Sequence, residues 1–190
     1  MSELHDSQVR LIKFNSKLDL VVSTDQTGNI EIWDPDTLSF PEDGRLKFEL
    51  LSETDFYSLI ENETFALSME FSPDSNLLAI YCKDCKIRVF HFITGRLIQV
   101  IDESVQALIA AQESEEPDAL VFMQNEQDFQ AKIAGYKEAM RLWWGTMEKA
   151  YLPSLAFDES SSLLCYSSPI GVKLGSAATG KLLKVYGKGE

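Results

Sequence analysis

Residues 5–34 have the sequence HDSQVRLIKFNSKLDLVVSTDQTGNIEIWD, and this stretch decides the fold. It contains three short apolar runs, at residues 9–14, 18–23 and 30–33. Residues rich in Asn, Ser, Asp and Gly separate the runs at close intervals. Short runs of Val, Ile and Phe that are interrupted in this way are typical of an antiparallel meander.

The same pattern recurs twice along the chain. Residues 66–99 and 153–186 align with the first copy when Phe14, Phe71 and Phe157 are superposed. Both later copies also contain a Thr-Gly turn followed by a further apolar run, which predicts a fourth strand. In the first copy the fourth strand is expected at residues 46–51, within a segment, residues 37–64, that also contains a polar, acidic loop. Units of four short strands that repeat along a chain predict the blades of a β-propeller.

These units resemble WD40 repeats, and the first copy matches the pattern best. The resemblance implies a hydrogen-bonded tetrad of His5, Ser23, Asp25 and Trp33. In that arrangement the Asp holds the His and the Ser links the His to the Trp, so the four residues stabilise the fold. The second copy keeps a turn acid, Asp84, and the third is expected to be a degenerate blade.

A narrower resemblance depends on two sequence runs. The phrase LIKFN and the run FITGRLIQVIDES, residues 92–104, resemble the peptidylprolyl isomerase and WD-repeat family. Its members are nuclear, spliceosome-associated proteins that join a WD40 propeller to a C-terminal cyclophilin. The resemblance implies that this chain is the propeller part, without the cyclophilin domain and without its isomerase activity.

A helical insertion is expected between the second and third units. Pro117 and Asp118 form a helix-start signal, and apolar residues then recur at spacings of three, four and seven. This stripe predicts one helix of about 25 residues, with a shorter helix before it at residues 104–112. Two alternatives are open, a helix docked on the propeller and an exposed arm. The candidate partner contacts are Tyr136, Trp143 and Trp144.

Chemical motifs in the sequence are weak. Cys82 and Cys85 have the spacing of a metal or redox pair, but no second pair of ligands completes a zinc set. Phe122-Met123-Gln124 resembles part of a cyclophilin active-site motif but lacks its paired glycines. We therefore expect no catalytic residues, no metal ligands and no cofactor.

The charge balance gives an expectation about partners. The formal net charge is −13, with 17 basic residues against 30 acidic ones. Nucleic-acid binding needs clustered Lys and Arg, so direct binding to DNA or RNA is not expected. A basic protein partner is favoured electrostatically. The sequence has no apolar run long enough for a membrane span, and three cysteines fit a reducing compartment.

Together these patterns predict a mainly β chain, a partial WD40 propeller of about three four-stranded blades with a long helical insertion. The expected divisions are residues 1–101 for two blades, 102–150 for the insertion and 151–190 for the third blade, all as a fragment of a larger propeller. The predicted function is a non-catalytic scaffold in a nuclear, spliceosomal or chromatin assembly. The alternatives are a generic WD40 adaptor and histone-tail binding by the acidic surface.

Overall fold

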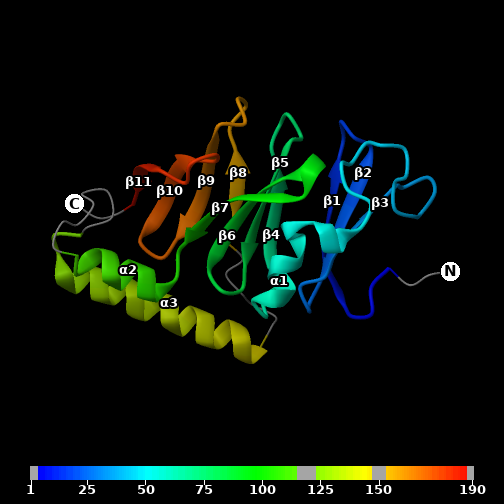
Figure 1. Ribbon diagram of the computed structural model, residues 1–190. Coiled ribbons are helices and arrows are strands. Elements are labelled where there is room, and N and C mark those ends of the chain that lie inside the picture. The colour runs from blue at the N-terminus through cyan, green and yellow to red at the C-terminus, as the bar shows by residue number, and fades with distance from the viewer. Residues whose placement is uncertain (1–3, 115–122, 147–152, 188–190) are drawn as a thin grey trace.

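Three antiparallel sheets form the framework of the molecule (Figure 1). The structure is a computed structural model that describes residues 4–114, 123–146 and 153–187. The sheets stand side by side in the order of the chain, with the helices below and between them. Within the described ranges, no helix combines the length and the apolar character needed to cross a bilayer.

The first sheet is the meander formed by residues 9–33. Its strands are β1 (Val9–Asn15), β2 (Leu20–Asp25) and β3 (Ile30–Trp33), in the order β1-β2-β3. The turn between β2 and β3 requires glycine, because Gly28 has a φ of +89° and an added Cβ would lie 2.2 Å from the Thr64 carbonyl oxygen. The first three apolar runs therefore form strands where the sequence predicts them.

The second and third sheets each have four strands in sequence order. The second sheet consists of β4 (Ala66–Phe71), β5 (Leu77–Cys82), β6 (Lys86–His91) and β7 (Arg96–Asp102). The third sheet consists of β8 (Leu155–Phe157), β9 (Leu163–Ser168), β10 (Gly171–Ser176) and β11 (Leu182–Tyr186). All pairings are antiparallel between neighbours in the chain, so short connections suffice.

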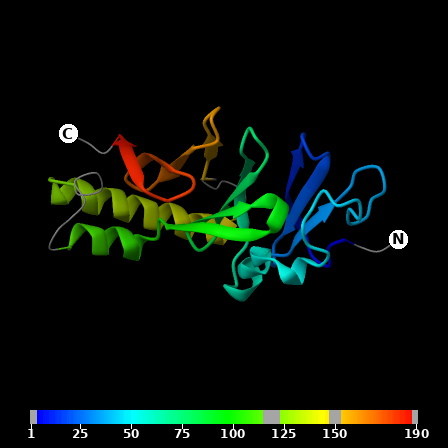
Figure 2. The same cartoon turned by 45° about the horizontal axis from the view of Figure 1, so that its top comes forward.

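Short helices fill the space between the first two sheets, and longer ones cover the third. The short ones are η1 (Leu51–Glu53), η2 (Asp55–Tyr57), α1 (Ser58–Glu61) and η3 (Phe92–Thr94). The longer helices are α2 (Val105–Gln112) and α3 (Glu126–Thr146), which run side by side in both views (Figures 1 and 2). The Ser104 hydroxyl caps α2 by accepting a hydrogen bond from the Ala107 amide at 3.2 Å.

Apolar side chains from both faces of the second sheet form two separate cores. Leu78 and Ile80 of β5 pack towards the first sheet, together with Phe90 and Phe92. The alternate residues of β5, Ala79 and Tyr81, belong to a core shared with the third sheet. A third core lies between α2, α3 and the third sheet, and its buried members are Leu108, Met123, Phe129, Ile133 and Ile170. Side chains of a strand alternate between faces, so a single sheet can join both neighbours.

A buried ion pair joins the second and third sheets. The Lys173 ammonium on β10 lies 2.8 and 2.7 Å from the two carboxylate oxygens of Glu103, which follows β7. The two side chains are only 4% and 3% exposed. Burial and the nearby Glu103 carboxylate raise the pKa of Tyr166. Because both charges are out of water, each is stabilised mainly by the other.

The predicted fold is wrong. The described chain is mainly β with three open sheets and few helices, in place of a partial WD40 propeller of four-stranded blades with one long helical insertion. The first sheet has three strands, because the expected fourth strand at residues 46–51 does not form. The helical part contains α2 and a 21-residue α3 that begins at Glu126. Pro117 and Asp118 lie outside the described residues. The division into three parts stays a prediction.

Breaking the buried pair should destabilise the protein strongly. Lys173→Met leaves the Glu103 carboxylate buried without its partner, and we expect a loss of about 3–5 kcal/mol in the free energy of unfolding. Adding Glu103→Gln should restore a large part of that loss. Urea denaturation followed by circular dichroism measures both changes.

The matched control is the exposed pair Lys86–Asp102, with a separation of 3.5 Å and side chains that are 37% and 41% exposed. Lys86→Met should cost no more than about 1 kcal/mol. Equal losses for Lys173→Met and Lys86→Met would contradict the assignment of Lys173 as the stabilising partner.

Candidate functional site

Four side chains at one end of the first sheet form a continuous hydrogen-bond chain. His5 Nδ1 lies 3.1 Å from the Asp25 carboxylate, and His5 Nε2 lies 2.7 Å from the Ser23 hydroxyl. The Trp33 indole donates to the same hydroxyl at 3.1 Å. The His5 and Asp25 side chains are 5% and 2% exposed. The structure therefore brings His5, Ser23, Asp25 and Trp33 together.

The second oxygen of Asp25 is also fully engaged. It accepts hydrogen bonds from the Thr27 amide at 2.9 Å, the Thr27 hydroxyl at 2.7 Å and the Asn29 amide at 3.1 Å. Burial raises the pKa of Asp25, but the hydrogen bonds from Thr27, His5 and the two amides outweigh burial and lower it. A carboxylate with both oxygens occupied in this way holds the turn and the histidine in place.

The corresponding turn of the second sheet uses an arginine. The Asp84 carboxylate accepts two hydrogen bonds from the Arg88 guanidinium, at 3.0 and 2.6 Å.

Burial raises the pKa of Cys82 to about 12, and burial also raises the pKa of Cys85. Raised thiol pKa values disfavour the reactive thiolate. Among the residues that the structure describes, no group of His, Cys, Asp and Glu could hold a metal ion.

One of the predicted partner contacts on α3, Tyr136, lies against the second sheet, and other residues of the helix are buried in the core. Phe129 and Ile133 are buried in the helix core, and the Tyr136 hydroxyl lies 3.2 Å from the Cys85 sulfur. Trp143 and Trp144 are residues of α3, but their side chains lie outside the described part of the chain. Met123, from the motif that resembles cyclophilin, is buried in the same core, whereas Phe122 is outside the described residues.

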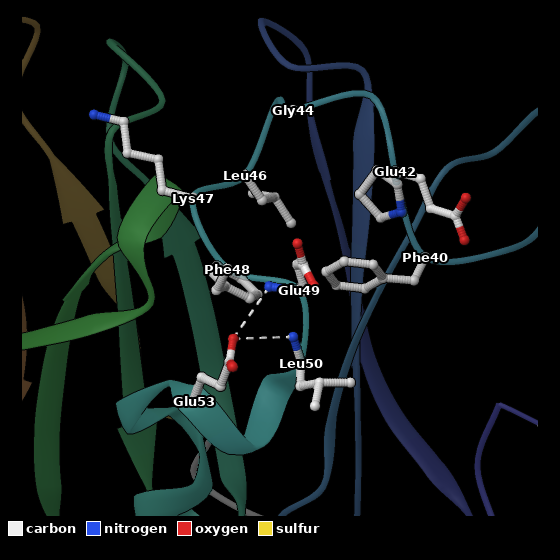
Figure 3. Close-up of a pocket in the computed structure, with 10 residues that line it drawn as sticks. Phe40, Glu42, Gly44, Leu46, Lys47, Phe48, Glu49, Leu50 and Glu53 are labelled. Carbon is white, nitrogen blue, oxygen red and sulfur yellow. Dashed lines mark hydrogen bonds between the residues drawn. The ribbon is translucent and has the colours of Figure 1, made fainter.

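An open groove between the first and second sheets was not predicted from the sequence. Its volume is about 920 Å³ (Figure 3). The Phe40 and Phe48 rings lie 5.9 Å apart between centroids, and Leu50 is 61% exposed. The residues that line it are Phe40, Pro41, Glu42, Gly44, Leu46, Lys47, Phe48, Glu49, Leu50 and Glu53. They belong to one connecting segment, for which the sequence predicts a fourth strand at residues 46–51 and a polar, acidic loop.

Carboxylates dominate the charge of this groove. Glu42 and Glu49 are exposed, and Glu53 accepts hydrogen bonds from the amides of Glu49 and Leu50 at 3.3 and 3.4 Å (Figure 3). Lys47 is the only basic residue among those that line the groove. The groove therefore combines an aromatic floor with a negatively charged rim.

Comparisons with known proteins give isomerases over nearly the whole chain. The chain is 36% identical over 188 residues to "Peptidyl-prolyl cis-trans isomerase CYP71" of Arabidopsis thaliana, covering 99% of this chain and 28% of that protein. It is 30% identical over 191 residues to "Peptidyl-prolyl cis-trans isomerase cyp15" of Rhizopus delemar, covering 100% and 29%. The human "Peptidylprolyl isomerase domain and WD repeat-containing protein 1" is 29% identical over 192 residues, covering 99% and 27%. No protein-family model matches the chain.

These names correct the predicted function. The chain was expected to be a non-catalytic WD40 scaffold from which the isomerase is missing. The names of these relatives state peptidyl-prolyl isomerisation. The matched regions cover 98–100% of this chain. The descriptions as a non-enzyme, as a generic WD40 adaptor and as a histone-tail binder are not retained. The chain spans just over a quarter of the length of these curated relatives, so the named activity belongs to much longer proteins.

Removing the Asp25 charge should destabilise the first sheet. Asp25→Asn weakens the hydrogen bonds to His5 and Thr27, and we expect a loss of about 1–3 kcal/mol in the free energy of unfolding at pH 7. The lowered pKa of Asp25 means that its stabilisation is present above the unfolded-state value of about 3.9 and is lost as the pH falls through the lower folded-state value.

The difference between Asp25→Asn and the parent protein should therefore shrink below about pH 4. Chemical denaturation at a series of pH values measures it. Asp36→Asn, in an exposed turn, is the control and should change stability little at any pH. A difference that does not vary with pH would show that the Asp25 charge is not the cause.

Proposed function

We propose that this chain is part of a peptidyl-prolyl cis–trans isomerase. The observation that supports the proposal is the alignment of relatives with that name along 98–100% of the chain. The reaction is rotation about the partial double bond that precedes proline, which has a barrier of about 18–20 kcal/mol. Uncatalysed isomerisation takes tens to hundreds of seconds, so it is slow enough to limit folding.

Two arginines near the sheet turns, Arg45 and Arg88, are bonded to partners within the chain. Arg88 is bonded to Asp84, and Arg45 to Asp34 and to the carbonyl oxygens of Leu18 and Asp19. The groove of Figure 3 exposes Leu50 and part of Phe40. The proposal therefore assigns the activity to the whole isomerase of which the chain is part. The assay below also determines which part of that polypeptide contains the active centre.

We also propose a nuclear location with protein partners. The net charge of −13 supports attraction of basic partner proteins and disfavours direct contact with nucleic-acid phosphates. A spliceosomal or chromatin assembly contains partners of this kind. Imaging of the tagged full-length protein measures its location, and a cytoplasmic signal alone would overturn this part of the proposal.

The polypeptide that contains this chain should catalyse prolyl isomerisation. A model peptide with one Xaa-Pro bond, followed by a conformation-dependent absorbance, should relax faster in proportion to the concentration of added protein. Relaxation at the uncatalysed rate would overturn the proposal.

The same assay on residues 1–190 assigns the active centre. Catalysis by this segment alone places the centre within it, and catalysis by the full polypeptide alone places it elsewhere in that protein. Lys173→Met and Lys86→Met separate loss of stability from loss of activity, because only the first should destabilise the segment strongly.

A further inference from the structure

We propose that the groove lined by residues 40–53 binds a polypeptide segment in which a basic side chain stands next to an apolar one. The groove lies between the first two sheets, beside the loop that carries Leu46 and Phe48 (Figure 3). This inference goes beyond isomerisation and does not depend on it, because it assigns a separate binding surface to the described part of the chain.

The apolar part of the ligand is indicated by the exposed carbon surface of the groove. Leu50 is 61% exposed, and Phe40 is only partly buried at the edge of the first core. The Phe48 ring continues the aromatic surface inwards to Phe56, with centroids 6.3 Å apart. An aliphatic or aromatic side chain placed here would remove carbon surface on both sides from water, which is favourable by about 25 cal/mol per Å².

The basic part of the ligand is indicated by the rim. The residues that line the groove include three glutamates, Glu42, Glu49 and Glu53, and one lysine, Lys47. The net charge of the whole chain has the same sign. An arginine or lysine is therefore attracted, while an acidic peptide or a phosphate group is repelled.

The walls of the groove are fixed before any ligand arrives. The Arg45 guanidinium donates to the Leu18 carbonyl oxygen at 2.8 Å and to the Asp19 carbonyl oxygen at 3.0 Å, and it pairs with Asp34. The Lys47 amide donates to the Ile93 carbonyl oxygen at 2.8 Å. A groove that is already ordered loses little conformational entropy on binding.

The size of the groove limits the ligand to a few side chains. Its volume of about 920 Å³ falls within the range of about 300–1,000 Å³ that is typical of ligand pockets. The structure therefore favours a short linear segment of a partner protein over a large folded surface.

Fluorescence anisotropy with a labelled hexapeptide of alternating leucine and arginine tests the proposal on the 190-residue chain. We expect saturable binding that weakens as salt is added, because salt screens exposed charges. The matched peptide with glutamate in place of arginine should not bind. Absence of binding by the arginine peptide, or equal binding by both peptides, would overturn the proposal.

Paired variants assign the binding to the groove. Glu42→Gln with Glu49→Gln should weaken binding of the arginine peptide about three- to tenfold, since exposed ion pairs contribute little individually. Leu50→Ser should weaken it separately by removing apolar contact. The control, Glu61→Gln with Glu63→Gln, changes the net charge equally at exposed positions that do not line the groove.

The control should bind like the parent protein, and unchanged melting temperatures should show that all variants are folded. Equal weakening by the control pair would mean that overall charge is responsible, and the groove would be excluded. The isomerase assay is independent, so failure of either proposal is recognised without the other.

Discussion

Burial of both faces of the second sheet is the constraint on which the rest of the structure depends. On β5, Leu78 and Ile80 pack towards the first sheet, whereas Ala79 and Tyr81 pack towards the third. A strand buried on both faces cannot shift its register by one residue, because every side chain would exchange one core for the other. The neighbouring sheets are positioned by these alternating side chains.

Polar contacts set the relative positions of the sheets at their loops. The Asn15 side-chain amide donates to the Ser75 carbonyl oxygen at 3.1 Å, which joins the first loop to the second. The Asp74 amide donates to the Ser161 hydroxyl at 3.1 Å, which joins the second loop to the third. Apolar packing has no direction, whereas a hydrogen bond does, and the buried Asn15–Ser75 bond is costly to leave unmade. The cores therefore provide most of the stabilisation, and these bonds restrict the sheets to one arrangement.

Local signals in the sequence predict the strands and the start of one helix well. They fail where contacts between residues distant in the sequence determine the conformation. The apolar runs of the first meander and the Ser104 cap of α2 depend on nearby residues alone. Residues 46–51 have the composition of a strand, but the Lys47 amide bonds to Ile93 and the amides of Glu49 and Leu50 bond to Glu53. The start of α3 is set by Asn125, whose side chain accepts hydrogen bonds from the amides of Gln127 and Asp128. The groove has no signal in the sequence, since its shape depends on how that connecting segment folds back over two sheets.

A groove for basic, apolar segments and an isomerase in one polypeptide would act together through proximity. Held by Glu42 and Glu49, a bound segment would remain near the active centre at an effective concentration set by the connecting chain, which reaches the millimolar range for short flexible links. Prolyl isomerisation is slow without catalysis, so a substrate that stays nearby meets the centre many times before it leaves. The groove would then select which prolyl bonds are isomerised without contacting proline itself. Selectivity of this kind depends on residues near the bond and is weakened by salt, whereas the chemistry at the bond is not.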